Sequence, residues 1–111
     1  MRSVTAYAIA GITFGLLGSS AVAADDPIEG QAIAEEHCSS CHDVAAGGGF
    51  KEYPPSFAAM AVYRSEAQIR AMIMYPALHT AMPDVPLYLL VKDKLDGLVT
   101  YILSLEETAK R

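Results

Sequence analysis

Two cysteines and a histidine lie together in the segment Cys-Ser-Ser-Cys-His at residues 38–42, and the chain has no other cysteine. His42 follows Cys41 directly, so three side chains that can bond to a metal or a cofactor are neighbours. A disulfide between Cys38 and Cys41 would close a very short loop and add little stability, because the entropy removed from the unfolded chain grows with loop length. The two thiols are therefore expected to act together, and to act with His42.

Four kinds of chemistry use paired cysteines at this spacing. A thioredoxin-like dithiol needs a βαβ unit, but the sequence has no alternating strand pattern. A structural zinc site needs four ligands, whereas this segment offers three, and the adjacent Cys41 and His42 would point apart on a helix. A plain disulfide leaves His42 without a role.

The fourth chemistry is covalent attachment of c-type haem, for which C-x-x-C-H is the signature. Two thioether bonds would fix the edge of the porphyrin to the end of a helix, and the next residue could then ligate the iron. The sequence therefore predicts one covalent haem c per chain, attached through Cys38 and Cys41, with His42 as an iron ligand. A small chain also gains a large apolar group around which to pack its loops.

A helix that begins at Asp26 would position this segment. Asp26 can cap the helix, Pro27 suits the first helical position, and Glu29 follows Asp26 at the spacing of a capping box. The residues that then recur at helical spacing are Gly30, Ile33, Ala34, His37, Cys38 and Cys41. The pattern places both cysteines on one side of the C-terminal end of this helix.

Two further helices are predicted after it. Ser65 and Gln68 form a capping box at the start of a helix over residues 65–75, and Pro76 ends it. The third helix starts near Asp93 and runs to about residue 107, and its apolar side consists of Leu95, Leu98, Val99, Ile102 and Leu105.

The rest of the chain is predicted to be mostly loop. Glycine and proline make residues 43–56 and 77–92 loops, and residues 56–64 fit a short helix or irregular packing equally well. The fold class is therefore all-α, with two terminal helices, one middle helix and long loops wrapped round the haem.

The sequence resembles the class I c-type cytochromes over about residues 26–107. Besides the C-x-x-C-H segment, the matching residues are Gly30, Pro54 or Pro55, Ala81-Met82-Pro83 and Tyr101. The resemblance implies a small cytochrome c fold in which the terminal helices cross at Gly30 near Tyr101. It also implies that the carbonyl of Pro54 or Pro55 accepts a hydrogen bond from His42, and that Met82 is the second iron ligand.

The chain departs from the family pattern at two places. Ala34 stands where the family often has an aromatic residue, which predicts a looser helix crossing. The chain has no tryptophan to bond a haem propionate, and Tyr53, Tyr63 and Arg64 are alternatives for that role.

The sixth position of the iron has several candidates. Met82 follows His42 at a distance that lets a proline-rich loop reach the opposite face of the haem, and Pro83 stiffens the approach. His79 in the same loop is the main alternative. The other methionines considered are Met60, Met72 and Met74, for which packing in the core is the ordinary role. His37 is interpreted as a surface or packing histidine.

Residues 1–24 have the pattern of a signal peptide, and residues 25–111 are predicted to be the cytochrome domain. Arg2 precedes an apolar stretch over residues 7–17, and Ala21-Val22-Ala23 is a small-residue cleavage site. Cleavage would make the protein periplasmic or secreted, whereas an uncleaved leader would anchor it in a membrane. Removal of the leader takes away one of 8 Lys and Arg and none of 13 Asp and Glu, so the net charge changes from −5 to −6.

These features predict a monohaem carrier that passes single electrons between a redox protein donor and acceptor, and that is not itself an enzyme. The acidic surface suits partners with basic patches and argues against nucleic acid. No small-molecule substrate is expected. Two alternatives remain open: a cytochrome subunit of a dehydrogenase complex, and a haem-based sensor or ligand-binding protein.

Overall fold

The computed structural model describes residues 26–48 and 53–110, and these residues contain helices and no strand. The elements are α1 (Pro27–His37), α2 (Phe57–Tyr63), α3 (Glu66–Met74), a 3₁₀ turn (Pro76–Leu78), α4 (Asp84–Val91), α5 (Leu95–Ser104) and α6 (Glu106–Ala109). The predicted all-α class is confirmed. The predicted leader lies outside the described residues. Within the described part, none of the helices has the length and apolar character needed to span a bilayer.

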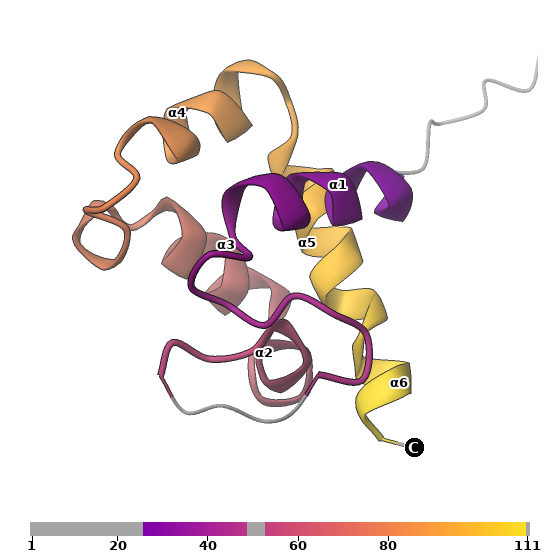
Figure 1. The fold of residues 1–111 in the computed structure, drawn as a ribbon. Coiled ribbons are helices and arrows are strands. Elements are labelled where there is room, and N and C mark those ends of the chain that lie inside the picture. Colours follow the sequence, from indigo (N-terminus) through magenta and orange to yellow (C-terminus); the bar gives the residue numbers. More distant parts are fainter. Residues whose placement is uncertain (1–25, 49–52, 111) are drawn as a thin grey trace, which may run out of the picture.

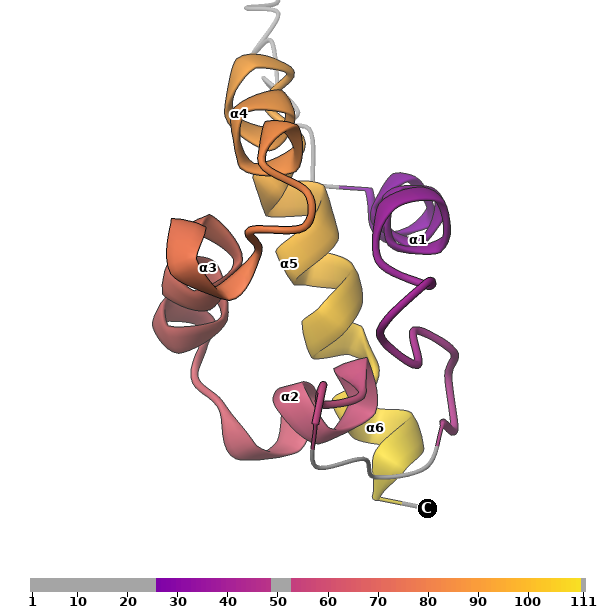
Figure 2. The ribbon, with the colours of Figure 1, turned by 60° about the vertical axis from the view of Figure 1, so that its left-hand side comes forward.

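Helix α5 is the central element of the fold. In Figure 2 it runs through the middle of the molecule, with α1 on one side and α3 on the other. Helices α2 and α6 lie at its C-terminal end, and α4 lies beyond its N-terminal end (Figure 1). The two terminal helices α1 and α5 therefore meet, as predicted. Among the described residues, α2, α3 and α4 lie between them in the chain, where one middle helix was expected and a second was left open.

Helix α1 starts where the sequence predicts, with one difference in its cap. The carboxylate of Asp26 accepts a hydrogen bond from the amide of Ile28 at 2.9 Å. Glu29 does not complete a capping box; its carboxylate pairs with the ammonium group of Lys94 just before α5. The charge of Glu29 thus ties the start of α1 to the start of α5, because an oppositely charged group from another element is within reach.

The crossing of α1 and α5 depends on Gly30, whose backbone lies directly on that of Gly97. A Cβ atom on Gly30 would lie 2.0 Å from the carbonyl oxygen of Gly97 and 2.8 Å from Cβ of Tyr101. Only a residue without a side chain allows the two backbones to approach this closely. Ala34, one turn after Gly30, is fully buried, so the crossing is tight rather than loose as the small residue there suggested.

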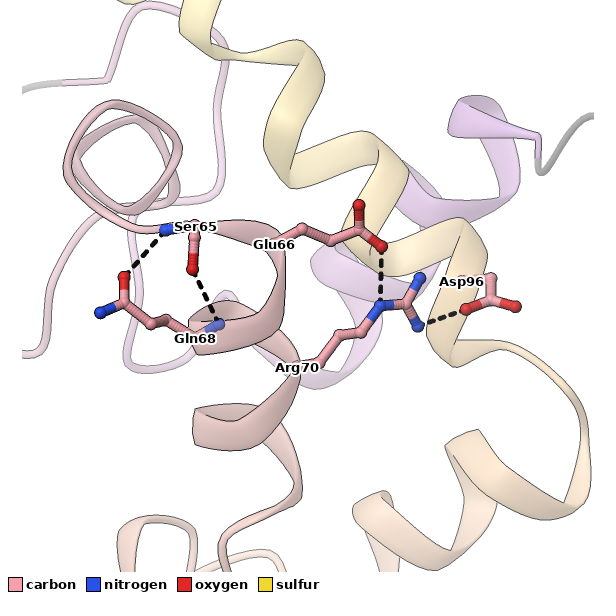
Figure 3. Close-up of polar contacts among 5 residues, drawn as sticks. All are labelled: Ser65, Glu66, Gln68, Arg70 and Asp96. Atoms are coloured by element: carbon pink, nitrogen blue, oxygen red, sulfur yellow. Dashed lines mark hydrogen bonds and ion pairs between the residues drawn. The ribbon is translucent and has the colours of Figure 1, made fainter.

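Helices α2 and α3 are both capped by serine. Ser56 accepts a hydrogen bond from the amide of Ala59, and α2 buries Phe57, which settles the undecided segment 56–64 as a helix. The predicted capping box of Ser65 and Gln68 is present at the start of α3 (Figure 3). One turn later, Arg70 pairs with Glu66 of its own helix and with Asp96 of α5 (Figure 3), which joins the two helices.

Helix α4 corrects the prediction that residues 77–92 are all loop. Its sequence contains Pro86, which sequence reasoning took as a helix breaker. Pro86 lies in the first turn of α4, where the backbone N–H groups have no partner inside the helix and proline is tolerated. The helix holds Leu89 fully buried but leaves Leu87 and Leu90 exposed.

Helix α5 begins two residues later than the predicted start near Asp93. Asp93 has a positive φ of 54°, and it ends α4 instead. The amide of Lys94 donates to the carbonyl of Leu89 at 2.8 Å and that of Asp93 to Leu90 at 3.2 Å, which is a Schellman motif. The predicted apolar side of α5 is buried as expected at Leu98, Val99, Ile102 and Leu105.

Candidate functional site

His42 is fixed by the turn that follows α1. The amides of Cys41 and His42 both donate to the carbonyl of Cys38, at 3.2 and 2.9 Å. The imidazole Nδ1 of His42 then donates to the carbonyl of Pro55 at 2.7 Å, which decides between the two prolines that the sequence left open. Since a carbonyl oxygen only accepts, Nδ1 carries the ring proton and Nε2 keeps the lone pair that a metal needs.

The loop after His42 is held from two directions. The amide of Phe57 donates to the carbonyl of Asp43 at 2.9 Å, and the Tyr101 hydroxyl donates to the carbonyl of Val44 at 2.6 Å. The ring of Phe57 also lies 5.6 Å from the ring of His42, centre to centre. Residues from α2 and α5 thus fix the backbone that carries His42. The tyrosine that the resemblance placed at the helix crossing has this second role, which sequence reasoning missed.

The two cysteines have different surroundings. Cys38, the residue that ends α1, is buried, and burial raises the pKa of its thiol to about 11. Cys41 lies beyond the helix and is exposed, and the hydroxyl of Ser40 donates to its sulfur at 3.7 Å. Cys38 lines the cavity described next, whereas Cys41 lies at the surface and is not among the lining residues, so the prediction that both cysteines share one side of the helix end is not met.

A cavity of about 300 Å³ opens beside Cys38 and His42. A cavity of this volume falls within the range of cofactor and ligand sites. The wall is mostly apolar and comes from α2, α3, α4 and α5 and from the segments between the helices, with these lining residues: Cys38, His42, Tyr53, Pro55, Phe57, Met60, Arg64, Met72, Ile73, Leu78, His79, Met82, Val85, Pro86, Leu89, Leu98 and Ile102. The residues present therefore fit a large apolar group that needs a nitrogen ligand.

Met82 and His79 bring two further donors to the cavity. The amide of Met82 donates to the carbonyl of His79 at 3.0 Å, so the two residues belong to one turn. The amide of Val85 donates to the carbonyl of Met82 at 3.3 Å, which joins this turn to the start of α4. The side chain of Met82 is half-buried. The hydrogen bond to Val85 ties the backbone of Met82 to the first turn of α4.

His79 lies opposite the ring of His42, with 6.4 Å between the two ring centres and 43° between their planes. Its Nδ1 is buried and has no hydrogen-bond partner among the described residues. Burial lowers the pKa of His79 and the neighbouring His42 lowers it further, whereas hydrogen bonding of the ring to the backbone at Ile73 and Met72 raises it. The neutral imidazole is therefore favoured.

The other candidates divide between the cavity wall and the rest of the molecule. Met60 and Met72 line the cavity from helices, and Met74 is not among the lining residues. His37 lies outside the lining set, with its ring 5.1 Å from that of Tyr88, which confirms a packing role.

Two of the three candidate partners for a haem propionate line the cavity. These are Tyr53 and Arg64, and Arg64 brings a positive charge to the wall. Tyr63 is 72% exposed and is not among the lining residues.

A helical shell around an apolar cavity, with C-x-x-C-H at its edge and a backbone-oriented histidine inside, defines a c-type cytochrome domain. A family model described as "Cytochrome C oxidase, cbb3-type, subunit III" matches residues 25–102, and the chain belongs to this family. The protein is accordingly a monohaem electron-transfer cytochrome with covalently bound haem c. Comparison with curated proteins and with solved structures gave no match.

Proposed function

We propose that the protein carries single electrons between a donor and an acceptor protein outside the cytoplasm. In this proposal Cys38 and Cys41 hold the haem, and His42 and Met82 ligate the iron from opposite sides. The observation that carries it is the hydrogen bond from Nδ1 of His42 to the carbonyl of Pro55 at 2.7 Å. It leaves Nε2 as a ligand oriented in advance, because a second partner of this kind fixes both the tautomer and the ring.

The chain's own residues favour a carrier over an enzyme. Haem iron supplies one-electron exchange, and ligation by imidazole and thioether raises its reduction potential. Met82 is held between the turn at His79 and the start of α4, and it lines the mostly apolar cavity. When both axial positions are filled by the protein, no position remains for oxygen or peroxide.

The location rests on residues 1–24. Cleavage of this leader would release a periplasmic or secreted protein of net charge −6, and retention would leave it anchored to a membrane. Attachment of c-type haem fits this location, because it requires haem and reduced cysteines outside the cytoplasm. Mass spectrometry of the protein purified from the periplasm would give the start of the chain.

The acidic surface points to partners with basic patches. Opposite charges increase the rate of encounter, and salt screens this attraction over about 10 Å at 0.1 M. We therefore expect the rate of electron exchange with a physiological partner to fall as salt is added. A rate that stays flat or rises would contradict steering by the acidic surface.

The cofactor and its ligands can be tested on one preparation. Optical spectra of the oxidised and reduced protein report haem and its axial ligands, and denaturing electrophoresis after acid–acetone extraction reports covalent attachment. We expect haem to stay on the wild type and on Ser39→Ala, and to be lost from a variant that lacks both cysteines. Haem that leaves the wild type on extraction would overturn the assignment of Cys38 and Cys41.

A second candidate function is that of a subunit in a redox complex. The family description names a subunit of a cbb3-type oxidase, and α4 exposes Leu87, Leu90 and Val91 on the surface. A free carrier migrates alone on a native gel of the periplasmic fraction, whereas a subunit of an oxidase or a dehydrogenase migrates with its complex. A ligand-binding or sensor protein would instead bind carbon monoxide readily in the reduced form.

A further inference from the structure

One turn of the chain brings two possible iron ligands to the same wall of the cavity. His79 and Met82 both line it, and the amide of Met82 bonds to the carbonyl of His79 at 3.0 Å. The proposed function uses one ligand opposite His42. A second donor in the same turn needs a separate explanation, since a buried ring nitrogen such as Nδ1 of His79 is costly in apolar surroundings.

The separation of the His79 and His42 rings matches that of two ligands on opposite sides of a metal. With metal–nitrogen bonds of about 2.0 Å and about 1.1 Å from each nitrogen to its ring centre, two imidazoles on opposite sides of a metal have centres about 6.3 Å apart. The two ring centres here are 6.4 Å apart. The angle of 43° between the rings is compatible with this arrangement, because each ring can turn about its bond to the metal.

The hydrogen bonding of His79 points the same way. Nδ1 of His79 is buried without a partner among the residues that the structure describes. Buried polar side-chain atoms are nearly always bonded, so an exception calls for an explanation such as a ligand or an ion. His37 offers a contrast: it lies outside the cavity lining, packs on Tyr88 and lies 3.8 Å from the carboxylate of Glu36.

We infer that His79 is a reserve axial ligand, which occupies the position opposite His42 whenever Met82 leaves it. The inference rests on the proposed haem site. Imidazole suits the harder iron(III), and thioether favours iron(II). Because both donors lie in one turn, they can exchange without movement of α3 or α5. The exchange keeps both axial positions filled, so a dissociating methionine does not open the iron to external ligands.

The experiment compares four holoprotein variants: Met82→Ala, Met82→Ala with His79→Ala, Met82→Ala with His37→Ala, and His79→Ala alone. Met82→Ala, with or without His37→Ala, should remain six-coordinate and low-spin, with the near-infrared charge-transfer bands of two imidazole ligands when oxidised. His79→Ala alone should keep the wild-type spectrum, and only the variant that lacks both Met82 and His79 should have an open iron site. If His79 fills the position more than about nine-tenths of the time, carbon monoxide should bind the opened variant at least about tenfold more tightly than Met82→Ala, since apparent affinity scales with the fraction of open sites.

Two results would overturn the inference. One is Met82→Ala that is high-spin and binds carbon monoxide as tightly as the variant that also lacks His79. The other is an open site in His79→Ala alone, which would make His79 the resident ligand and would also remove Met82 from that role. Neither result affects the covalent haem or His42, which are read separately from the extraction test on the wild type. The near-infrared bands of Met82→Ala decide the point even if the double variant does not fold.

Discussion

Helix α5 packs against another helix on one side and faces a cavity on the other. Toward α1, the protein completes the packing itself: the backbone of Gly30 lies directly on Gly97, and Tyr101 fills the space beside them. Toward α3 and α4, α5 presents Leu98 and Ile102 to a cavity of about 300 Å³. The first side is a helix crossing that needs no cofactor, and the second side is a shell that needs one.

The difference teaches where the stability of this small domain comes from. A domain of this length buries a limited core, and chains of this size often depend on a bound group as well. Helix α4 illustrates the dependence, because it has one fully buried side chain, Leu89, and that side chain lines the cavity. Without haem, α4 would lose much of what it packs against, whereas the crossing of α1 and α5 would keep its contacts.

The largest effect is expected when both cysteines are replaced by alanine. The chain should then lack covalent haem and be mostly unfolded by far-UV circular dichroism, and any remaining hydrogen-exchange protection should lie in α1 and α5. Replacement of Ser39 and Ser40 by alanine is the matched control, and should retain haem and fold. A haem-free double cysteine variant with wild-type helix content and a cooperative thermal transition would show that the two sides of α5 do not differ in this way.

A single methyl group added at Gly30 should disrupt the crossing of α1 and α5. A Cβ on Gly30 would lie 2.0 Å from a backbone oxygen that cannot move without its helix, whereas a Cβ on Gly97 would meet nothing closer than 3.6 Å. Gly30→Ala should therefore lower the free energy of unfolding by about 3 kcal/mol, the upper part of the usual range for overpacking. Gly97→Ala should be neutral or stabilise by up to about 1 kcal/mol, because alanine favours a helix.

Urea denaturation of the two holoproteins measures this pair, with optical spectra to verify that the haem site is unchanged. An equal loss of unfolding free energy in Gly30→Ala and Gly97→Ala would mean that the helices do not cross at Gly30. A loss in Gly97→Ala alone would reverse the roles of the two glycines.

The sequence predicted local features on both sides of α5 better than it predicted the wall of the cavity. Caps and apolar spacing are local signals, so the start of α1, the capping box of Ser65 and the buried stripe of α5 were predicted correctly. The wall of the cavity depends on how loops return to α5. Pro86 looked like a helix breaker because its place in the first turn of α4 was not recognised.

The same contrast applies to the candidate site. The C-x-x-C-H segment could be predicted because its spacing along the chain is the signal, and the resemblance to class I c-type cytochromes implied the bond of His42 to Pro54 or Pro55. The position of His79 relative to His42 could not, since the two residues are far apart in the sequence and meet only through the path of the loop. The contact of Gly30 with the backbone of Gly97 was missed for a similar reason, because the two residues lie on different helices.

Tyr101 allows a smaller test of the crossing side. Its hydroxyl donates to the carbonyl of Val44 at 2.6 Å, and both residues are buried. Tyr101→Phe would leave this carbonyl without its partner, so we expect a loss of about 1–3 kcal/mol in the free energy of unfolding at neutral pH. The exposed Tyr75 provides the control: Tyr75→Phe should stay within about 0.5 kcal/mol of the wild type.

The pH dependence of Tyr101 gives a second measurement on the same variant. Burial raises the pKa of Tyr101 above its ordinary value of 10.0, and the charges of Glu35 and Asp43 raise it further. The folded state therefore favours the neutral phenol. The stability from this preference is complete below pH 10 and is lost as pH rises from the unfolded to the folded pKa. Tyr101→Phe should lose less stability than the wild type between neutral pH and pH above 10, and equal losses would contradict this effect.

The smallest effect is expected at Arg70, the ion pair that joins α3 to α5 on the cavity side. The guanidinium of Arg70 bonds to Glu66 at 2.9 Å and also to Asp96 (Figure 3). The side chains of Arg70 and Asp96 are 33% and 43% exposed, so water and salt screen their attraction. A double-mutant cycle with Arg70→Gln and Asp96→Asn should give a coupling of about 0.2–1 kcal/mol that shrinks as salt is added.

The same cycle with Glu66→Gln is the matched control, because that pair lies within α3 and joins no second helix. A coupling above about 2 kcal/mol between Arg70 and Asp96, unchanged by salt, would mean that this ion pair fixes α3 on α5 without help from the haem, and the contrast between the two sides of α5 would then fail.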